Sequence, residues 1–199
     1  MVKIAINDSN LVLGPATLYV ASYPAGEPAD AAVTPNGYLT PPGAPWVDVG
    51  ATDGGVAFEI DQTYTDLTAD QVTMSVGSRL TESKMTVTAK LSEMTYANLQ
   101  TAINNIGITA SGTGWQSMEI PVGTASTQPS YMALIVDGWA PMTTNSTPAL
   151  RRIIVRKVLS QVKASFMYDR KTQQSLDCTF TCYFINGTTN PIHMVDELV

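Results

Sequence analysis

Charged residues are scarce in this sequence: Asp, Glu, Lys and Arg make up 14% of the 199 residues, whereas hydrophobic residues make up 44%. Thr, Ser, Gly and Pro are abundant. This balance is typical of many short strands joined by turns, and it argues against a helical bundle. A chain of this length can bury a sizeable core without disulfide staples, so we expect one mainly β domain over residues 1–199.

Cysteine and histidine are nearly absent, with two cysteines and one histidine. Cys178 and Cys182 lie in an alternating run at 175–184, where an extended chain separates their Cα atoms by about 13 Å, too far for a disulfide. We interpret both as small core hydrophobes. His193 has no second histidine or cysteine pair at a spacing that completes a metal site. We expect no metal, no cofactor and no catalytic residues, and therefore not an enzyme.

Long hydrophobic runs are missing as well: there is no run of signal-peptide length and none of the roughly 18 apolar residues that cross a membrane. We expect folding in a cytoplasm, without membrane insertion. The net charge is −6, from 13 acids and 4 bases in residues 1–150 and 4 acids and 7 bases in residues 151–199. Such asymmetry can steer copies together head to tail, or it can reflect two solvated faces. An acidic total argues against tight, general binding of nucleic acid.

The first part of the chain predicts a short strand at 17–21 and then a long Pro- and Gly-rich loop over residues 22–50. Loops of this length inside a compact domain are usually functional or disordered. With no active site in view, we expect this loop to contact a neighbouring subunit.

A clear alternation begins after Gly55, where Val56, Phe58 and Ile60 indicate a strand with one buried face. A similar alternation at 72–76 predicts a second strand. Between them, we predict a long acidic hairpin loop at residues 61–71, which lack Gly and Pro. The spacing of the acids at 59–70 fits no EF-hand loop, because the glycine and the terminal glutamate that such a loop needs are absent. We predict contacts between subunits there, through Asp61, Tyr64, Asp66 and Asp70.

The next strand, at 84–91, runs into a helix at about 92–106, because Ser92 is a good N-cap and apolar residues follow at helical spacing. Further strands are expected at 131–139, within 150–169 and at 175–184, followed by a C-terminal arm at 185–199. The 150–169 segment is basic, with Arg151, Arg152, Arg156 and Lys157. We predict that these bases pair with acidic residues between subunits or within one; phosphate contact is the alternative.

Three stretches, at 54–73, 84–104 and 184–197, resemble in their order the major tail tube proteins of long-tailed bacteriophages. They comprise a glycine-led strand with an acidic hairpin, a strand ending in a helix, and a polar segment after the closing strand. The resemblance is one of layout and covers roughly two thirds of the chain. The first 50 residues match nothing in that family.

The resemblance implies a β-sandwich or partial barrel with one flanking helix, assembled as hexameric rings that stack into a β-barrel tube around a DNA channel. It implies a virion protein of the tail, assembled in the host cytoplasm. The partners would be other copies of the chain together with tape measure, tail terminator and baseplate proteins, while DNA passes without specific binding. An acidic lumen repels DNA, and Glu59 and Asp61 are the candidates for its lining.

Two other functions stay open. One is a different virion component of similar architecture, such as a tail terminator, a baseplate ring or a capsid decoration protein. The other is a carbohydrate-binding β-sandwich module that uses Trp46, Trp115 and Trp139.

Overall fold

The computed structural model describes Val12 and residues 14–33, 40–104, 108–120, 129–141, 149–161, 168, 170–171 and 173–197. These residues form a mainly β structure with a single α-helix among them. Their strands are β1 (Thr17–Ser22), β2 (Val47–Asp48), β3 (Thr52–Leu67), β4 (Gly77–Leu91), β5 (Ile108–Gly112), β6 (Trp115–Glu119), β7 (Met132–Ala140), β8 (Ala149–Ser160), β9 (Leu176–Cys182) and β10 (Ile192–Asp196).

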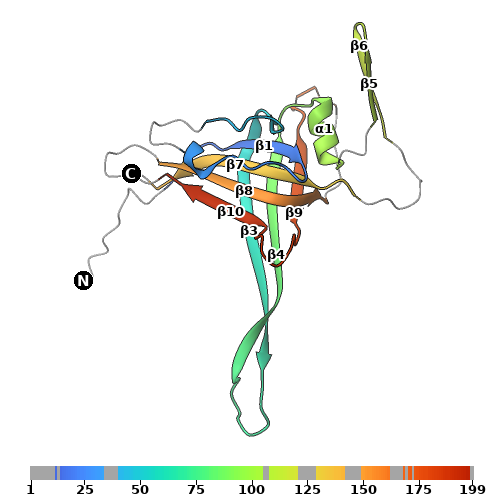
Figure 1. Ribbon diagram of the computed structural model, residues 1–199. Coiled ribbons are helices and arrows are strands. Elements are labelled where there is room, and N and C mark those ends of the chain that lie inside the picture. Colours follow the sequence, from blue (N-terminus) through green and yellow to red (C-terminus); the bar gives the residue numbers. More distant parts are fainter. Residues whose placement is uncertain are drawn as a thin grey trace.

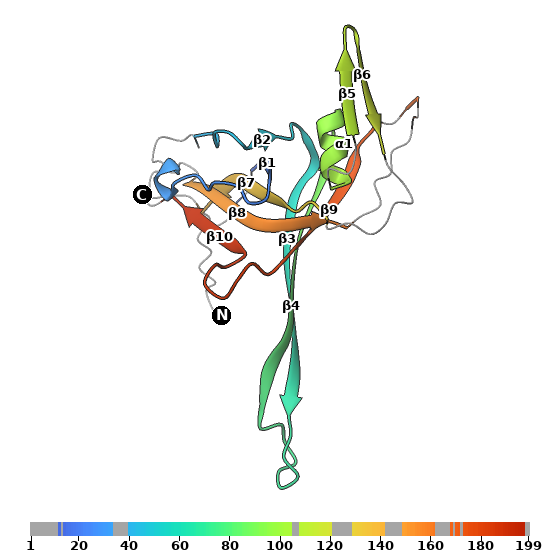
Figure 2. The same cartoon turned by 45° about the vertical axis from the view of Figure 1, so that its right-hand side comes forward.

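Eight strands form one antiparallel sheet in the order β2-β1-β7-β8-β9-β4-β3, with β10 also paired to β8. β5 and β6 form a separate hairpin. Two long hairpins leave the body in opposite directions: β3–β4 on one side and β5–β6 on the other, next to helix α1 (Tyr96–Ala102) (Figures 1 and 2).

The main core lies between two halves of this bent sheet, so the body is sandwich-like. Leu18, Leu134 and Val155 come from β1, β7 and β8, whereas Val87 and Phe180 come from β4 and β9. All five side chains are fully buried and belong to one cluster. The alternating pattern predicted for these strands therefore places its apolar face inward.

A second, smaller core lies on the opposite face of β1, β7 and β8, beneath the 22–50 segment. Trp46 packs there against Ile135 and Ile154, and its indole Nε1 donates a hydrogen bond to the Gly26 carbonyl at 2.8 Å. The described part of this segment thus covers its own subunit, since burying Trp46 removes much apolar surface from water. Contact of this loop with a neighbouring subunit stays a prediction; residues 34–39 lie outside the described residues.

The helix is shorter than predicted, at Tyr96–Ala102 rather than 92–106. Thr95, not Ser92, is the N-cap, and its side chain accepts a hydrogen bond from the Asn98 amide at 3.1 Å. The reason lies in a tertiary contact: Glu93 accepts the amide of Ala51 at 3.1 Å and so holds the preceding residues in an extended connection. Residues 105–107 lie outside the described part of the chain.

The C-terminal segment was predicted as an arm, but residues 192–196 form strand β10 on the edge of β8 of the same subunit. Arg151 donates to both carboxylate oxygens of Asp196, at 2.6 Å each. This bidentate geometry is the strong form of a charge-assisted pair, and it lowers the pKa of Asp196. Paired in this way, the segment is part of the sheet.

Candidate self-assembly interface

The β3–β4 hairpin is the longest hairpin in the described chain, and its outer half is exposed. Its strands pair from Val56 and Ala89 outward to Leu67 and Gly77. At about 3.3 Å per residue, the 16 residues of β3 span about 50 Å. The inner half crosses the body, where Phe58 packs against the core, and the outer half projects beyond it (Figure 1).

The hairpin is longer than predicted, and its connection lies further along the chain. Residues 61–67 belong to β3 rather than to a loop, and the connection runs from 68 to 76. The strand predicted at 72–76 is wrong, because these residues turn the chain: the Val72 amide donates to Ala69 at 3.0 Å and the Val76 amide to Leu67 at 2.8 Å. Local closure of the turn outweighs the alternation of Val72, Met74 and Val76.

Apolar side chains continue along the hairpin past the point where the core ends. Opposite residues of an antiparallel pair share a face, so Ile60 and Met85, and then Tyr64 and Leu80, extend the face of Phe58. Ile60 is 54% exposed, Tyr64 55% and Leu80 50%. The prediction of a buried Ile60 is wrong, because Ile60 lies beyond the residues that pack on the main core in the described part of the chain. The other exposed large apolar residues of the hairpin lie at its tip: Leu67, Val72, Met74 and Val76.

The opposite face of the hairpin is polar. Glu59 and Asp61 lie on it, opposite Thr86 and Lys84 respectively, and all but Thr86 are exposed. The predicted lumen-lining pair thus shares one face, on which Lys84 lies directly across from Asp61 and offsets part of the negative charge.

The four residues predicted to join subunits all lie on the exposed part of this hairpin. Asp61, Tyr64 and Asp66 belong to β3, and Asp70 belongs to the connection. Tyr64 and Asp66 lie on the face opposite that of Asp61. The phenol of Tyr64 donates to the side chain of Gln62 at 2.9 Å, which leaves its ring exposed to solvent.

Strand β3 is also an edge of the sheet, because among the described strands it pairs with β4 alone. The outer part of β4 is unpaired on its other side, since β9 reaches only as far as Thr86. Long, exposed strand edges present rows of backbone donors and acceptors that pair readily with another chain. The alternation after Gly55 predicted the strand. It could not predict that the strand lies at an edge, because alternation does not specify a strand's neighbours.

The basic residues of β8 are engaged within their own subunit. Arg152 is 1% exposed and donates to Asp137 through Nε at 2.7 Å and Nη2 at 2.6 Å. Its Nη1 finds no hydrogen-bond partner among the described residues. Lys157 lies 4.3 Å from the ring centre of Tyr131. The predicted role between subunits is wrong for Arg152, which is too deeply buried to meet another chain; the intramolecular alternative is the one observed.

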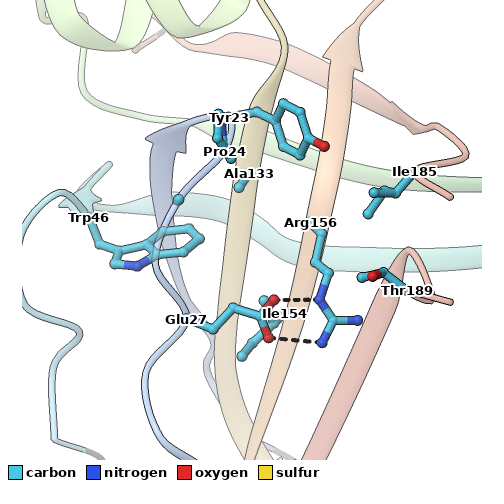
Figure 3. Close-up of a pocket in the computed structure, with 10 residues that line it drawn as sticks. Tyr23, Pro24, Glu27, Trp46, Ala133, Ile154, Arg156, Ile185 and Thr189 are labelled. Carbon is cyan, nitrogen blue, oxygen red and sulfur yellow. Dashed lines mark hydrogen bonds and ion pairs between the residues drawn. The ribbon is translucent and has the colours of Figure 1, made fainter.

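A hollow on the surface of the body lies between the end of β1, β8 and the loop before β10 (Figure 3). Tyr23, Trp46 and Ile185 form apolar parts of its wall. Across it, Arg156 binds both carboxylate oxygens of Glu27 and also the Asn190 carbonyl. The hydrogen bonds from Arg156 are the main cause that lowers the pKa of Glu27. Arg156 therefore ties the N-terminal loop to the C-terminal segment.

Both cysteines are free, and burial raises the pKa of Cys178 to about 12 and of Cys182 to about 11. Cys178 is 2% exposed and belongs to the main core, as predicted. Within the described ranges, no three His, Cys, Asp or Glu side chains gather as metal ligands. No helix in the described part of the chain has the length and hydrophobicity to cross a membrane.

In comparisons with known proteins, neither a family model nor a curated protein sequence matched this chain.

Proposed function

We propose that this protein is the structural subunit of a bacteriophage tail tube, which polymerises through the β3–β4 hairpin into stacked hexameric rings around a DNA channel. It is not an enzyme and needs no cofactor. It would act in the virion tail, with tape measure, tail terminator and baseplate proteins as further partners. The support is the layout of strands and helix described above, together with the exposed hairpin.

The observation that carries this proposal is the hairpin's apolar face. Ile60, Tyr64 and Leu80 are exposed on this face, and four more large hydrophobic side chains are exposed at the tip of the hairpin. Exposed apolar surface of this kind marks interaction sites. The same hairpin offers two open strand edges, so a second copy can add strands to it. Repeating that step around a ring removes every such edge, which a barrel achieves by closure.

In such a ring the polar face of β3, with Glu59 and Asp61, would line the channel. DNA is repelled by carboxylates, and the threonines beside them offer neither charge nor a large apolar surface. Lys84 would soften the acidic potential, so the lining would be weakly rather than strongly negative.

The test is electron microscopy and sedimentation of the purified chain, together with a Tyr64→Ser/Leu80→Ser variant. The wild-type protein should form rings or tubes with a central hole. The variant should remain folded and monomeric, because both positions are half exposed in the subunit. A matched control is Val47→Ser, which changes a residue that is 59% exposed on the body. If the hairpin variant assembles as well as this control, the hairpin is not the interface.

A single-ring or decoration protein of the virion is the second candidate, because the same hairpin suits any ring. Copy number decides between them: quantitative mass spectrometry of particles should find very many copies of a tube subunit and only one or a few rings of the alternative. The carbohydrate-binding module is less favoured, since Trp46 is buried and hydrogen-bonded in the body.

A further inference from the structure

The two strands of the long hairpin carry charges of opposite sign. Strand β3 contains four acids and no base: Asp53, Glu59, Asp61 and Asp66. Strand β4 contains three bases and one acid: Arg79, Lys84, Lys90 and Glu82. The net charge is therefore −4 for β3 and +2 for β4, so the hairpin has an acidic strand and a basic one.

This difference persists where the edges of the two strands are open. Among the described strands, β3 has no partner on its outer side along 56–67, and β4 has none at 77–85, because β9 pairs only with residues 86–91. The open stretch of β3 carries three acids, a net charge of −3, whereas the open stretch of β4 carries two bases and one acid, a net charge of +1. The one ion pair at the base of the hairpin, between Lys90 and Asp53 at 2.6 Å, lies outside both stretches.

The charges of the open stretches are available to another chain. Glu59, Asp61, Arg79 and Lys84 are exposed, and none of them forms an ion pair with any other described residue. All four lie on the polar face of the hairpin, since Arg79 is opposite Thr65, which alternates with Asp61 along β3. Acids on one strand and bases on the other thus point to the same side of the sheet.

We infer that copies of this chain associate head to tail, with the acidic open edge of β3 in one copy paired antiparallel to the basic open edge of β4 in the next. This inference rests on the proposed function, and it names the two surfaces that join neighbours within a ring. Pairing β3 with β3 would bring together two edges of −3, and pairing β4 with β4 two edges of +1. Only the mixed pairing places opposite charges side by side, and like charges on facing strands are destabilising.

The head-to-tail contact also fits the geometry of the hairpin. β3 runs away from the body and β4 runs back (Figure 1), so antiparallel pairing of β3 with β4 of the next copy leaves all hairpins pointing the same way. Each copy offers one edge of each kind, so the contact repeats and can close into a ring, whereas pairing of like edges stops at two copies. Paired strands share their faces, so the apolar face of every copy falls on one side and Glu59 and Asp61 on the other.

The experiment reverses one edge at a time and then mixes the variants. Glu59→Lys/Asp61→Lys makes the β3 edge basic, and Arg79→Glu/Lys84→Glu makes the β4 edge acidic. Each variant alone should need about ten-fold more protein than wild type to form tubes, because like charges then meet at every contact. An equimolar mixture should assemble within about three-fold of the wild-type concentration, since alternation of the two variants restores opposite charges at every contact. Each variant alone, at the same total concentration, is the control.

The pattern of losses separates the alternatives. If copies met β3 to β3, Arg79→Glu/Lys84→Glu would assemble like wild type; if they met β4 to β4, Glu59→Lys/Asp61→Lys would. Either result, or a mixture that assembles no better than its components, would overturn the head-to-tail contact alone. Circular dichroism and urea unfolding check that each variant folds, as expected for four exposed positions.

Amide hydrogen exchange of the wild-type protein supplies a readout that needs no variant. Residues 56–67 and 77–85 should both exchange more slowly in tubes than in the monomer, because both edges gain backbone partners. Tubes in which either stretch exchanges as in the monomer would overturn this contact while leaving the tail-tube proposal standing. A wild-type chain that never assembles would overturn both.

Discussion

The body of the sheet and the outer β3–β4 hairpin are built from the same kinds of residue but place them in opposite surroundings. Leu134 in β7 is fully buried, whereas Leu80 in β4 is 50% exposed. Burying a leucine side chain stabilises a fold by about 1.5–3 kcal/mol, so the body holds its own stability and the hairpin leaves part of the available burial unused. The outer hairpin thus carries apolar surface that the lone subunit leaves exposed, and this exposed surface is what supports the proposal that another copy covers it.

Deleting the outer hairpin should have the largest effect on assembly while leaving the stability of the body nearly unchanged. Joining Thr63 to Glu82 through an Asn-Gly turn preserves their pairing and deletes residues 64–81. We expect complete loss of assembly, and a change of no more than about 1 kcal/mol in the free energy of unfolding, because the deleted side chains are outside the core. Sedimentation velocity and urea unfolding measure the two effects. The milder Asp66→Asn/Asp70→Asn variant should weaken assembly without changing folding.

Breaking the buried ion pair should have the largest effect on the body. Asp137→Ala leaves the guanidinium of Arg152, 1% exposed, without its partner, which should cost about 3–5 kcal/mol of unfolding free energy. The matched control, Asp137→Leu/Arg152→Met, removes both charges and should recover most of that loss. A loss below 1 kcal/mol for the single variant, on the scale of an exposed pair, would show that the pair does not hold the body together.

Two leucine substitutions compare the regions directly. Leu134→Ala should cost about 2–5 kcal/mol in urea unfolding, because it opens a cavity in a filled core. Leu80→Ala should cost less than about 0.5 kcal/mol, as exposed positions do, yet it should weaken assembly. Equal costs at the two positions would mean that the hairpin packs within its own subunit.

The smallest expected effect concerns pH. Arg156 lowers the pKa of Glu27 in the folded state, so the unfolded state binds the proton more readily. The resulting stability is present above the unfolded pKa of glutamate and is lost as pH falls through the folded pKa. Because the pair is partly exposed, we expect less than about 1 kcal/mol. Glu27→Gln should reduce the loss of unfolding free energy on acidification, and an unchanged pH profile would contradict this role.

The sequence predicted the strands whose residues pack in the core. The expected strands at 17–21, 131–139 and 175–184 agree with β1, β7 and β9 within one or two residues, because burial on one face imposes alternation. It failed where no core enforces the pattern. Ile60 continues an alternation that the body no longer covers, and 72–76 alternates inside a turn.

Long-range pairs account for the other failures. The start of the helix depends on the contact between Glu93 and Ala51, 42 residues apart. Strand β10 depends on Arg151 and Asp196, 45 residues apart. The candidate site residues on the hairpin could be predicted because residues 61–71 are acidic and lack Gly and Pro. The apolar face that accompanies them was missed, because in sequence it looks like any buried strand.

The measurement that tests the central claim most directly is negative-stain electron microscopy of the purified wild-type chain over a range of concentrations and salt. The account predicts rings or tubes with a central hole, and their absence when residues 64–81 are removed. A wild-type protein that stays monomeric under every condition would contradict it.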